Sequence, residues 1–173
     1  MLYDLPSEAD MSPITGMLYS AVQQNSQRLQ SITKGMSLEE ADYRGPHNDC
    51  NSTAQLIRHV MRVDLNWVYR IKGLPLPQPL LEQYGPMIDE NNRLPMVREI
   101  ALETLFFDYD KILTMLKEAC SSLSDADLDR VVNFGHDNEK QATLRWGLWH
   151  MADHSRYHQA HINQLRKWYN ADR

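Results

Sequence analysis

Histidine is the residue type whose placement in this chain points most directly to chemistry. Seven histidines are present, and four of them fall within twelve positions: His150, His154, His158 and His161. On an ideal helix these four stand at about 0°, 40°, 80° and 20°, so they share one stripe. An imidazole pair at i, i+4 projects in one direction from neighbouring turns, so both rings can reach one metal ion. The stripe therefore predicts either a metal site or a polar network of histidines inside a helical protein.

A third ligand from a facing helix would complete a site with positions open for water or substrate. His59 has a suitable place, because it lies on the same face of a second helical segment as Val60, Val63 and Trp67. In a bundle of helices this face could meet the histidine stripe. The sequence contains no nucleophile elbow, Gly-rich phosphate loop or thiol motif. Any catalysis would then belong to the metal, and no catalytic side chain is assigned.

The elements that must position these histidines are helices, because four long segments have helical periodicity and none has a convincing strand period. Ser12 followed by Pro13 is a typical helix start. The capping box from Ser52 to Gln55 is another, and Gly73 ends the helix that follows. The predicted helices run from about Pro13 to Lys34, Ser52 to Lys72, Pro95 to Ser122 and Thr143 to Tyr169.

The connections between these helices carry weaker signals. A loop of roughly twenty residues separates the second and third helices, and loops of this length are often functional. Ser124 to Asp127 looks like a one-turn helix start, and Val131 to Phe134 could be a short extended piece. No repeat or linker divides the chain. The predicted fold class is therefore all-α, a single domain over residues 1–173 that is most simply a four-helix bundle.

Composition narrows the classes of partner. The chain has 18 Lys and Arg against 23 Asp and Glu, a net charge of −5, whereas electrostatic nucleic-acid binding needs a basic face. No apolar stretch approaches the roughly 20 residues of a membrane span. Cys50 and Cys120 lack CxxC spacing and are typical of reduced thiols in a cytoplasmic protein. We expect a cytoplasmic protein with neither a nucleic-acid nor a membrane partner.

Three segments carry a resemblance to a known family. WHMADHSRYHQ at 149–159 resembles the last helix of the DinB/YfiT superfamily, where H-x-x-N-H-x-x-x-H-R-G-Q is typical. STAQLIRHV at 52–60 is similar to the start of that family's second helix, and LSDADL at 123–128 is similar to the linker before its last helix. The resemblance covers nearly the whole chain and implies a four-helix bundle with an up-down-down-up course and long connecting loops.

The resemblance also implies a divalent metal held by His59, His154 and His158. His150 would line the site and would be the first substitute for an assigned ligand. Two features depart from the family pattern: Gln159 and Ala160 stand where Arg and Gly are usual, and Asp153 stands where Asn is frequent. The three histidines that the resemblance implies as ligands are present despite both changes. Asp64 and Asp153 are interpreted as structural residues or as partners of the ligand histidines.

Three imidazoles suit Zn²⁺, Ni²⁺, Fe²⁺ or Cu²⁺, whereas Mg²⁺ and Ca²⁺ prefer oxygen ligands; we expect Zn, Ni or Fe. The resemblance implies a metal-dependent thiol S-transferase or hydrolase of stress or detoxification type. Its substrate would be a small molecule or a low-molecular-weight thiol. Two alternatives stay open. One is a metal-binding, stress-induced bundle without turnover, and the other is a structural homodimer in which the histidine stripe is a polar core network.

Overall fold

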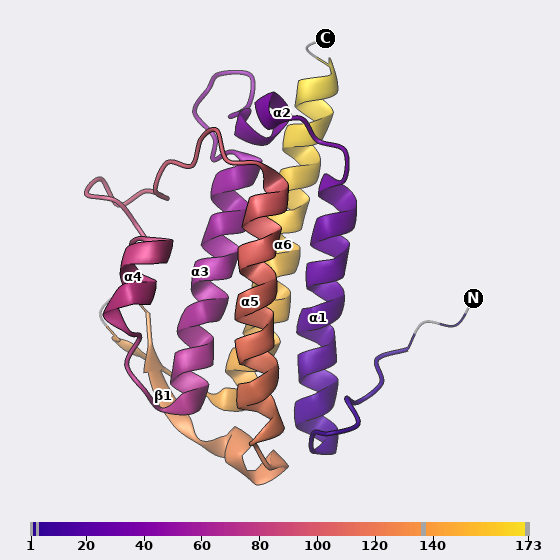
Figure 1. Ribbon diagram of the computed structural model, residues 1–173, viewed down its shortest axis with the longest axis vertical. Coiled ribbons are helices and arrows are strands. Elements are labelled where there is room, and N and C mark those ends of the chain that lie inside the picture. Colours follow the sequence, from indigo (N-terminus) through magenta and orange to yellow (C-terminus); the bar gives the residue numbers. More distant parts are fainter. Residues whose placement is uncertain (1, 3, 136–137, 172–173) are drawn as a thin grey trace.

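The computed structural model describes residue 2 and residues 4–135 and 138–171. Within these ranges four long helices lie along one another (Figure 1): α1 (Pro13–Thr33), α3 (Thr53–Lys72), α5 (Leu102–Ser121) and α6 (Leu144–Ala171). The shorter elements are α2 (Leu38–Asp42), α4 (Gln78–Tyr84), the 3₁₀ helix η1 (Asp125–Asp129) and the strands β1 (Val131–Phe134) and β2 (Lys140–Thr143). The prediction of a mostly helical chain is confirmed, with a small antiparallel sheet in addition.

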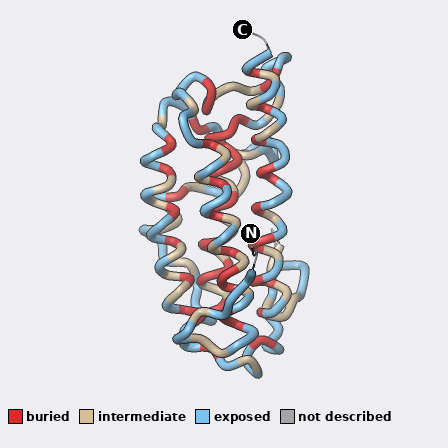
Figure 2. Tube along the Cα trace, turned by 90° about the vertical axis from the view of Figure 1, so that its right-hand side faces the viewer, coloured by how far each residue is buried: buried red, intermediate tan, exposed pale blue. Residues whose placement is uncertain are grey.

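The core lies between the long helices, because α1 packs against α5 and α6 while α3 packs against the same two helices. Buried residues recur along one side of each helix, as helical amphipathicity requires (Figure 2). Leu29, Ile57, Ile112 and Leu148 are fully buried representatives from the four helices. The contact between α3 and α6 matters most for function, since it brings His59 to the face of α6 that carries the histidine stripe.

Local signals explain how α3 begins and ends. The Ser52 hydroxyl accepts a hydrogen bond from the backbone N–H of Gln55, and the Gln55 side chain accepts one from the N–H of Ser52. This is the predicted capping box, which satisfies two backbone donors that the first turn leaves free. Gly73 ends the helix with a left-handed φ of 67°. The boundaries of the helix that carries His59 are therefore encoded in its own residues.

The start of α1 uses a partner that is distant in sequence. Ser12 has the extended backbone of an N-cap, but its hydroxyl donates to the Leu123 carbonyl at 2.6 Å instead of capping the helix. The carboxylate of Asp125 takes over this role and accepts hydrogen bonds from the backbone N–H groups of Ile14 and Thr15. The η1 segment thus caps the N-terminus of α1.

The third long helix begins later than the sequence predicts, at Leu102 and not near Pro95. The Gln55 side chain donates to the Pro95 carbonyl at 3.2 Å, and the Asp42 carboxylate accepts from the N–H of Glu99 at 2.8 Å. Glu99 also has a positive φ of 57°, which a helix does not allow. Contacts with other elements therefore hold this segment extended although its residues have helical spacing.

The two connections on either side of α5 differ in how well their short elements can be predicted from sequence. The loop after α3 contains the short helix α4, which the sequence does not predict. The expected one-turn helix after Ser124 is η1, and the expected extended piece is β1, whose Val131 pairs with Thr143 of β2. The sequence gives no signal for β2, because Lys140, Gln141 and Ala142 lack the β-branched and aromatic side chains that β1 contains.

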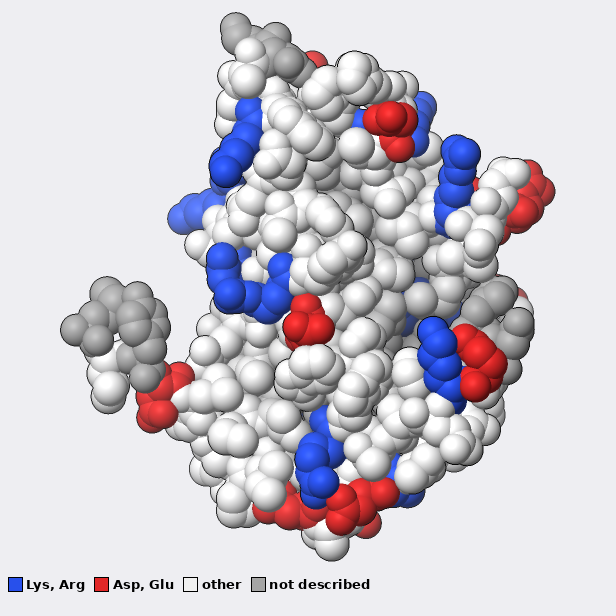
Figure 3. Space-filling view, turned by 180° about the vertical axis from the view of Figure 1, so that it is seen from behind, with Lys and Arg blue, Asp and Glu red and all other residues white. Residues whose placement is uncertain are grey.

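The surface combines both signs of charge. Acidic and basic side chains are interspersed on the face seen from behind (Figure 3). Cys50 and Cys120 are free thiols. Among the described helices, none combines the length and the apolar composition that crossing a bilayer requires.

Candidate metal centre

Three histidines from two helices meet between α3 and α6. Nε2 of His154 lies 3.1 Å from Nε2 of His59 and 3.0 Å from Nε2 of His158. One ring nitrogen from each residue falls within 4.8 Å of the other two. One helix contributes a single ligand and the other contributes a pair at i, i+4. The structure thus brings together the three histidines that the sequence predicts as ligands.

The donor set fits a transition metal better than it fits a hydrogen-bonded network. A neutral imidazole nitrogen that lacks a proton has one lone pair. His154 Nε2 faces both His59 Nε2 and His158 Nε2, and in either tautomer it offers one N–H or one lone pair, so it can make a normal hydrogen bond to only one of them. A tetrahedral Zn²⁺ with Zn–N bonds of about 2.05 Å sets its ligand nitrogens about 3.3 Å apart. The two separations from His154 Nε2 are close to this value, so the cluster could hold a metal ion.

Burial keeps these imidazoles neutral. It lowers the pKa of His59 from its ordinary value of 6.5 to about 4. Burial, and then the neighbouring His59 and His161, lower the pKa of His158 to about 4 as well. The pKa of His154 falls further, since burial is joined by repulsion from three other histidines. A metal ligand must be deprotonated to bind, so these shifts make the site available at neutral pH.

The ring nitrogens on the far side of the three histidines make no hydrogen bonds with the described residues. The Nδ1 atoms of all three rings are buried and have no hydrogen-bond partner among the described residues. Asp64 makes no hydrogen bond to these Nδ1 atoms. Its carboxyl group instead accepts one from the Tyr109 hydroxyl at 2.5 Å, between α3 and α5. Asp153 is exposed. Of the two interpretations of Asp64, the structural one is therefore supported, and the orientation of the ligand rings depends on packing.

The outer members of the histidine stripe do not join the group of three. The His150 ring stacks on Trp146 with centroids 4.5 Å apart, and its centroid lies 5.4 Å from that of His154. The His161 ring lies 5.7 Å from that of His158 and packs against Tyr157. His150 therefore flanks the centre, as the sequence predicts, and a shell closed by four histidines is not present in the described residues.

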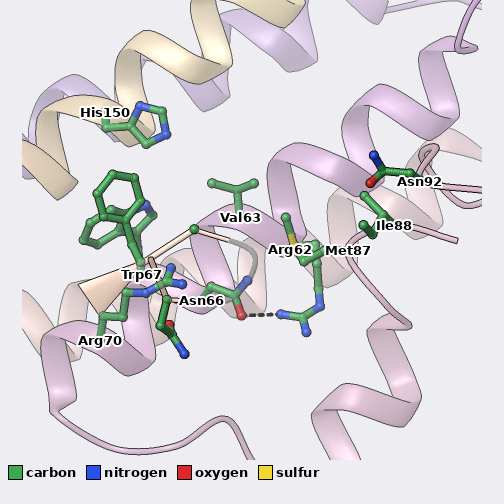
Figure 4. A pocket seen from close by; sticks show the side chains of 12 residues that line it. Arg62, Val63, Asn66, Trp67, Arg70, Met87, Ile88, Asn92 and His150 are labelled. Atoms are coloured by element: carbon green, nitrogen blue, oxygen red, sulfur yellow. Dashed lines mark hydrogen bonds between the residues drawn. The ribbon is translucent and has the colours of Figure 1, made fainter. Parts of the chain in front are cut away.

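A cavity of about 640 Å³ has His150 and Val63 in its wall (Figure 4). The His150 ring lies next to that of His154, with centroids 5.4 Å apart. Its walls come from α3, from the segment after α4, from α6 and from the end of β1 with the loop after it. The lining residues include Arg62, Asn66, Trp67, Arg70, Met87, Ile88, Asn92, Phe134, Gly135, Asn138 and His150. Sequence reasoning does not find this cavity. A signal is nevertheless present, because Arg62, Asn66 and Arg70 repeat at i, i+4, i+8 within about 60° of the His59 direction on the helix.

The fold and the site define a class: a mostly helical protein with a candidate three-histidine metal centre beside a cavity. A family model described as Mycothiol-S-transferase matches residues 17–171, so the chain belongs to this DinB/YfiT-like family. The chain is also 44% identical over 170 residues to the uncharacterized protein YkkA of Bacillus subtilis (strain 168), an alignment that covers 98% of this chain and 95% of YkkA. The resemblance stated from the sequence is confirmed.

Proposed function

We propose that this protein is a divalent-metal-dependent thiol S-transferase whose metal ligands are His59, His154 and His158. The observation that carries the proposal is the convergence of one ring nitrogen from each of the three histidines, each within 4.8 Å of the other two. Membership of the Mycothiol-S-transferase family supports a thiol as the cosubstrate. The ligand set favours Zn, Ni or Fe over Mg²⁺ or Ca²⁺.

The proposed reaction joins a small thiol to an electrophilic carbon. The thiol proton passes to solvent, the sulfur electron pair forms the new S–C bond, and the leaving group departs with the electrons of the bond that breaks. When bound, a divalent metal supplies Lewis acidity, which favours loss of the thiol proton at neutral pH. The chain contributes three imidazoles that stay neutral at that pH, and His150 and Val63 join their site to a cavity of suitable size for a small molecule.

The nucleophilic thiol has to come from a small molecule, because the protein's own thiols are poorly suited. Burial raises the pKa of Cys120 to about 12. Burial and the neighbouring Asp49 also raise the pKa of Cys50. Reactive cysteines have a lowered pKa, since the thiolate is the attacking species. This supports a two-substrate transferase over an enzyme that uses its own cysteine.

The larger organisation is part of the same proposal. We infer that residues 1–173 form one domain, a four-helix bundle of α1, α3, α5 and α6 with the up-down-down-up course of the DinB/YfiT family. We also propose that it acts in the cytoplasm as a homodimer. Sedimentation equilibrium tests the last point, and a single species of 20.2 kDa would contradict it.

Metal analysis of protein purified without an affinity tag tests the centre. The wild type, His154→Ala and His161→Ala are compared, and His161 is the matched control because it lies on the same stripe but outside the group of three. About one equivalent of Zn, Ni or Fe is expected in the wild type and the control, and little in His154→Ala. Metal retained by His154→Ala, or absent from all three proteins, would contradict the site.

A turnover assay separates the function from its alternatives. Metal-loaded protein is incubated with chlorodinitrobenzene and a panel of small thiols, and separately with an activated ester and no thiol. Thioether formation that requires both metal and thiol is the expected result. Ester cleavage without thiol would replace the proposal by the hydrolase alternative. Metal binding without either reaction would favour the metal-binding bundle without turnover.

A further inference from the structure

The cavity beside the histidine centre is lined by positive charge. Arg62 and Arg70 both contribute to its wall, and the described lining residues include no Asp or Glu (Figure 4). Neither arginine takes part in an ion pair with any residue that the structure describes. Two cations that share one concave site and form no ion pair with the described residues indicate a place for an anionic ligand.

Arg62 is the more deeply placed of the two, with 5% of its surface exposed. Its Nε donates to the Gly85 carbonyl at 3.0 Å, and its Nη1 donates to the Asn66 side-chain oxygen. Both acceptors are neutral, so the charge itself stays uncompensated. A guanidinium group has five N–H donors, and donors of Arg62 therefore stay available to a ligand. Burial, and then the nearby Arg70, lower the pKa of this group.

Arg70 is half-buried and lies against the ring of Trp67, with its guanidinium carbon 5.2 Å from the ring centroid. Its Nε donates to the Asn133 carbonyl at 3.1 Å. Its terminal nitrogens make no hydrogen bond with the described residues. The aromatic ring limits the motion of the guanidinium group, so this cation is positioned before a ligand arrives.

The arrangement along α3 suits a small molecule with an acidic group. Arg62, Asn66 and Arg70 occupy successive turns, and guanidinium groups match the two oxygens of a carboxylate or phosphate in bidentate contacts. We propose that this cavity binds the carboxylate or phosphate group of the small molecule that reacts at the histidine centre. The identity of that reaction rests on the proposed function, whereas anion binding at the arginines does not need the metal.

The position of the cavity connects the anion site to the centre. His150 lines it, one helical turn before His154, and Val63 lines it one turn after His59. A molecule anchored at the arginines can therefore extend along the contact between α3 and α6 toward the three Nε2 atoms. In the proposed transferase, this anchored molecule is the thiol cosubstrate, which would carry its acidic group at a distance from its sulfur.

The test measures anion binding directly in metal-free protein. Succinate and inorganic phosphate are titrated separately into ¹⁵N-labelled wild type, Arg70→Gln and Arg28→Gln, and the amide signals of α3 are followed by NMR. Arg70→Gln should fold, because Arg70 is half-buried and makes one backbone hydrogen bond. Arg28→Gln is the matched control, since it removes the same charge from an exposed position on α1.

Succinate, phosphate or both should shift the signals around Asn66 in the wild type and in the control. Affinity should fall roughly tenfold in Arg70→Gln, the loss expected for one charge-assisted contact. Equal affinity in Arg70→Gln and Arg28→Gln, or no movement of these signals with either anion, would overturn the inference. The anion that binds with the higher affinity identifies the acidic group of the ligand, as a carboxylate if it is succinate and as a phosphate if it is inorganic phosphate.

Two further measurements separate this inference from the proposed function. His154→Ala should bind the anion like the wild type, because anion binding does not need the metal. Anion binding by metal-loaded wild type that transfers no thiol would refute the function and leave the anion site in place. In metal-loaded protein, Arg70→Gln should raise KM for mercaptosuccinate and leave KM for uncharged mercaptoethanol unchanged. The anion site would be refuted, and the function left in place, if the protein transfers thiols but Arg70→Gln changes neither the anion affinity nor the KM for mercaptosuccinate.

Discussion

At the scale of single residues, burial decides which ionisable groups carry charge. Asp64 is fully buried between α3 and α5, where only the Tyr109 hydroxyl contacts it by a hydrogen bond among the described residues. Burial raises the pKa of its carboxyl group from 3.8 to about 8, against the opposing effect of that hydrogen bond. Asp64 is therefore protonated at neutral pH, and its role near the centre is structural.

The substitution Asp64→Asn tests this assignment, because it keeps the shape of the side chain and removes its titration. As pH rises from about 4 to about 8, the unfolded wild type loses a proton that the folded protein keeps, so wild-type stability falls over this range. The variant lacks this fall, so its stability relative to the wild type should rise by roughly 4 to 5 kcal/mol between pH 4 and pH 8. Urea unfolding at several pH values measures the difference, with Asp153→Asn as the exposed control. Parallel curves for wild type and Asp64→Asn would contradict the prediction.

At the scale of the elements, a close approach of α6 to α3 holds the histidines in place. Gly147 faces the ring of Trp67, and a Cβ atom at position 147 would overlap three carbons of that ring. Trp67 is itself 1% exposed, so it has little room to move. The absence of a side chain at Gly147 therefore sets the distance between the helices that carry His59 and His154.

Gly147→Ala should force the two helices apart. The overlap should cost about 1 to 3 kcal/mol of unfolding free energy, and the shift of α6 should weaken metal binding. Urea unfolding and zinc titration measure the two effects. A double-mutant cycle with Trp67→Leu provides the control, because the cost of Gly147→Ala should largely disappear once the ring is gone. An equal cost in both backgrounds would show that contact with Trp67 is not its cause.

The same elements explain how much of the molecule is predictable from sequence. The start of α3 is predictable because Ser52 and Gln55 cap it with local contacts. The meeting of His59 with His154 and His158 is predictable in outline, since the helical periods place them on inward faces. The start of α5 is not predictable, because its position depends on hydrogen bonds across the fold, one that Gln55 donates and one that Asp42 accepts.

The anion cavity is hidden in the sequence for a related reason. Part of its wall comes from α3, where Arg62 and Arg70 can be seen at helical spacing. Another part, with Met87 and Asn92, belongs to the segment after α4, next to the hydrogen bond from Arg62 to the Gly85 carbonyl, and the rest comes from α6 and from the end of β1 and its loop. Periodicity describes a single helix well and gives no information on which loop covers it.

At the scale of the whole molecule, a metal at the histidine triad would tie α3 to α6, which are separated by about 70 residues of chain. A ligand that binds only the folded state stabilises it by about 2.7 kcal/mol at a hundred times its dissociation constant. Zn²⁺ or Ni²⁺ should therefore raise the melting temperature of metal-free protein by about 5 to 10 °C. His161→Ala should keep this rise and His154→Ala should lose it. An equal rise in both variants would place the metal elsewhere.

The pH dependence of metal-free protein follows from the same three histidines. The pKa values of His59 and His158 are near 6.5 in the unfolded chain and about 4 in the folded protein. As pH falls from about 6.5 to about 4, the histidines bind protons in the unfolded state but stay neutral in the folded state. The free energy of unfolding should therefore fall by roughly 3 to 5 kcal/mol. Below pH 4 the slope from His59 and His158 should fade, whereas His154, whose folded-state pKa is lower, should continue to reduce stability.

The contribution of Asp64 has the opposite sign over the same range, so the measurement belongs in the Asp64→Asn background. There, urea unfolding should give the fall without compensation, and His59→Gln with His158→Gln should remove most of it. Zinc-loaded protein should keep its stability to lower pH, since protons must then displace the metal before the imidazoles can titrate. A flat profile between pH 6.5 and pH 4 in metal-free Asp64→Asn would mean that the three rings are open to solvent, and such a site would not hold neutral imidazoles together for a metal.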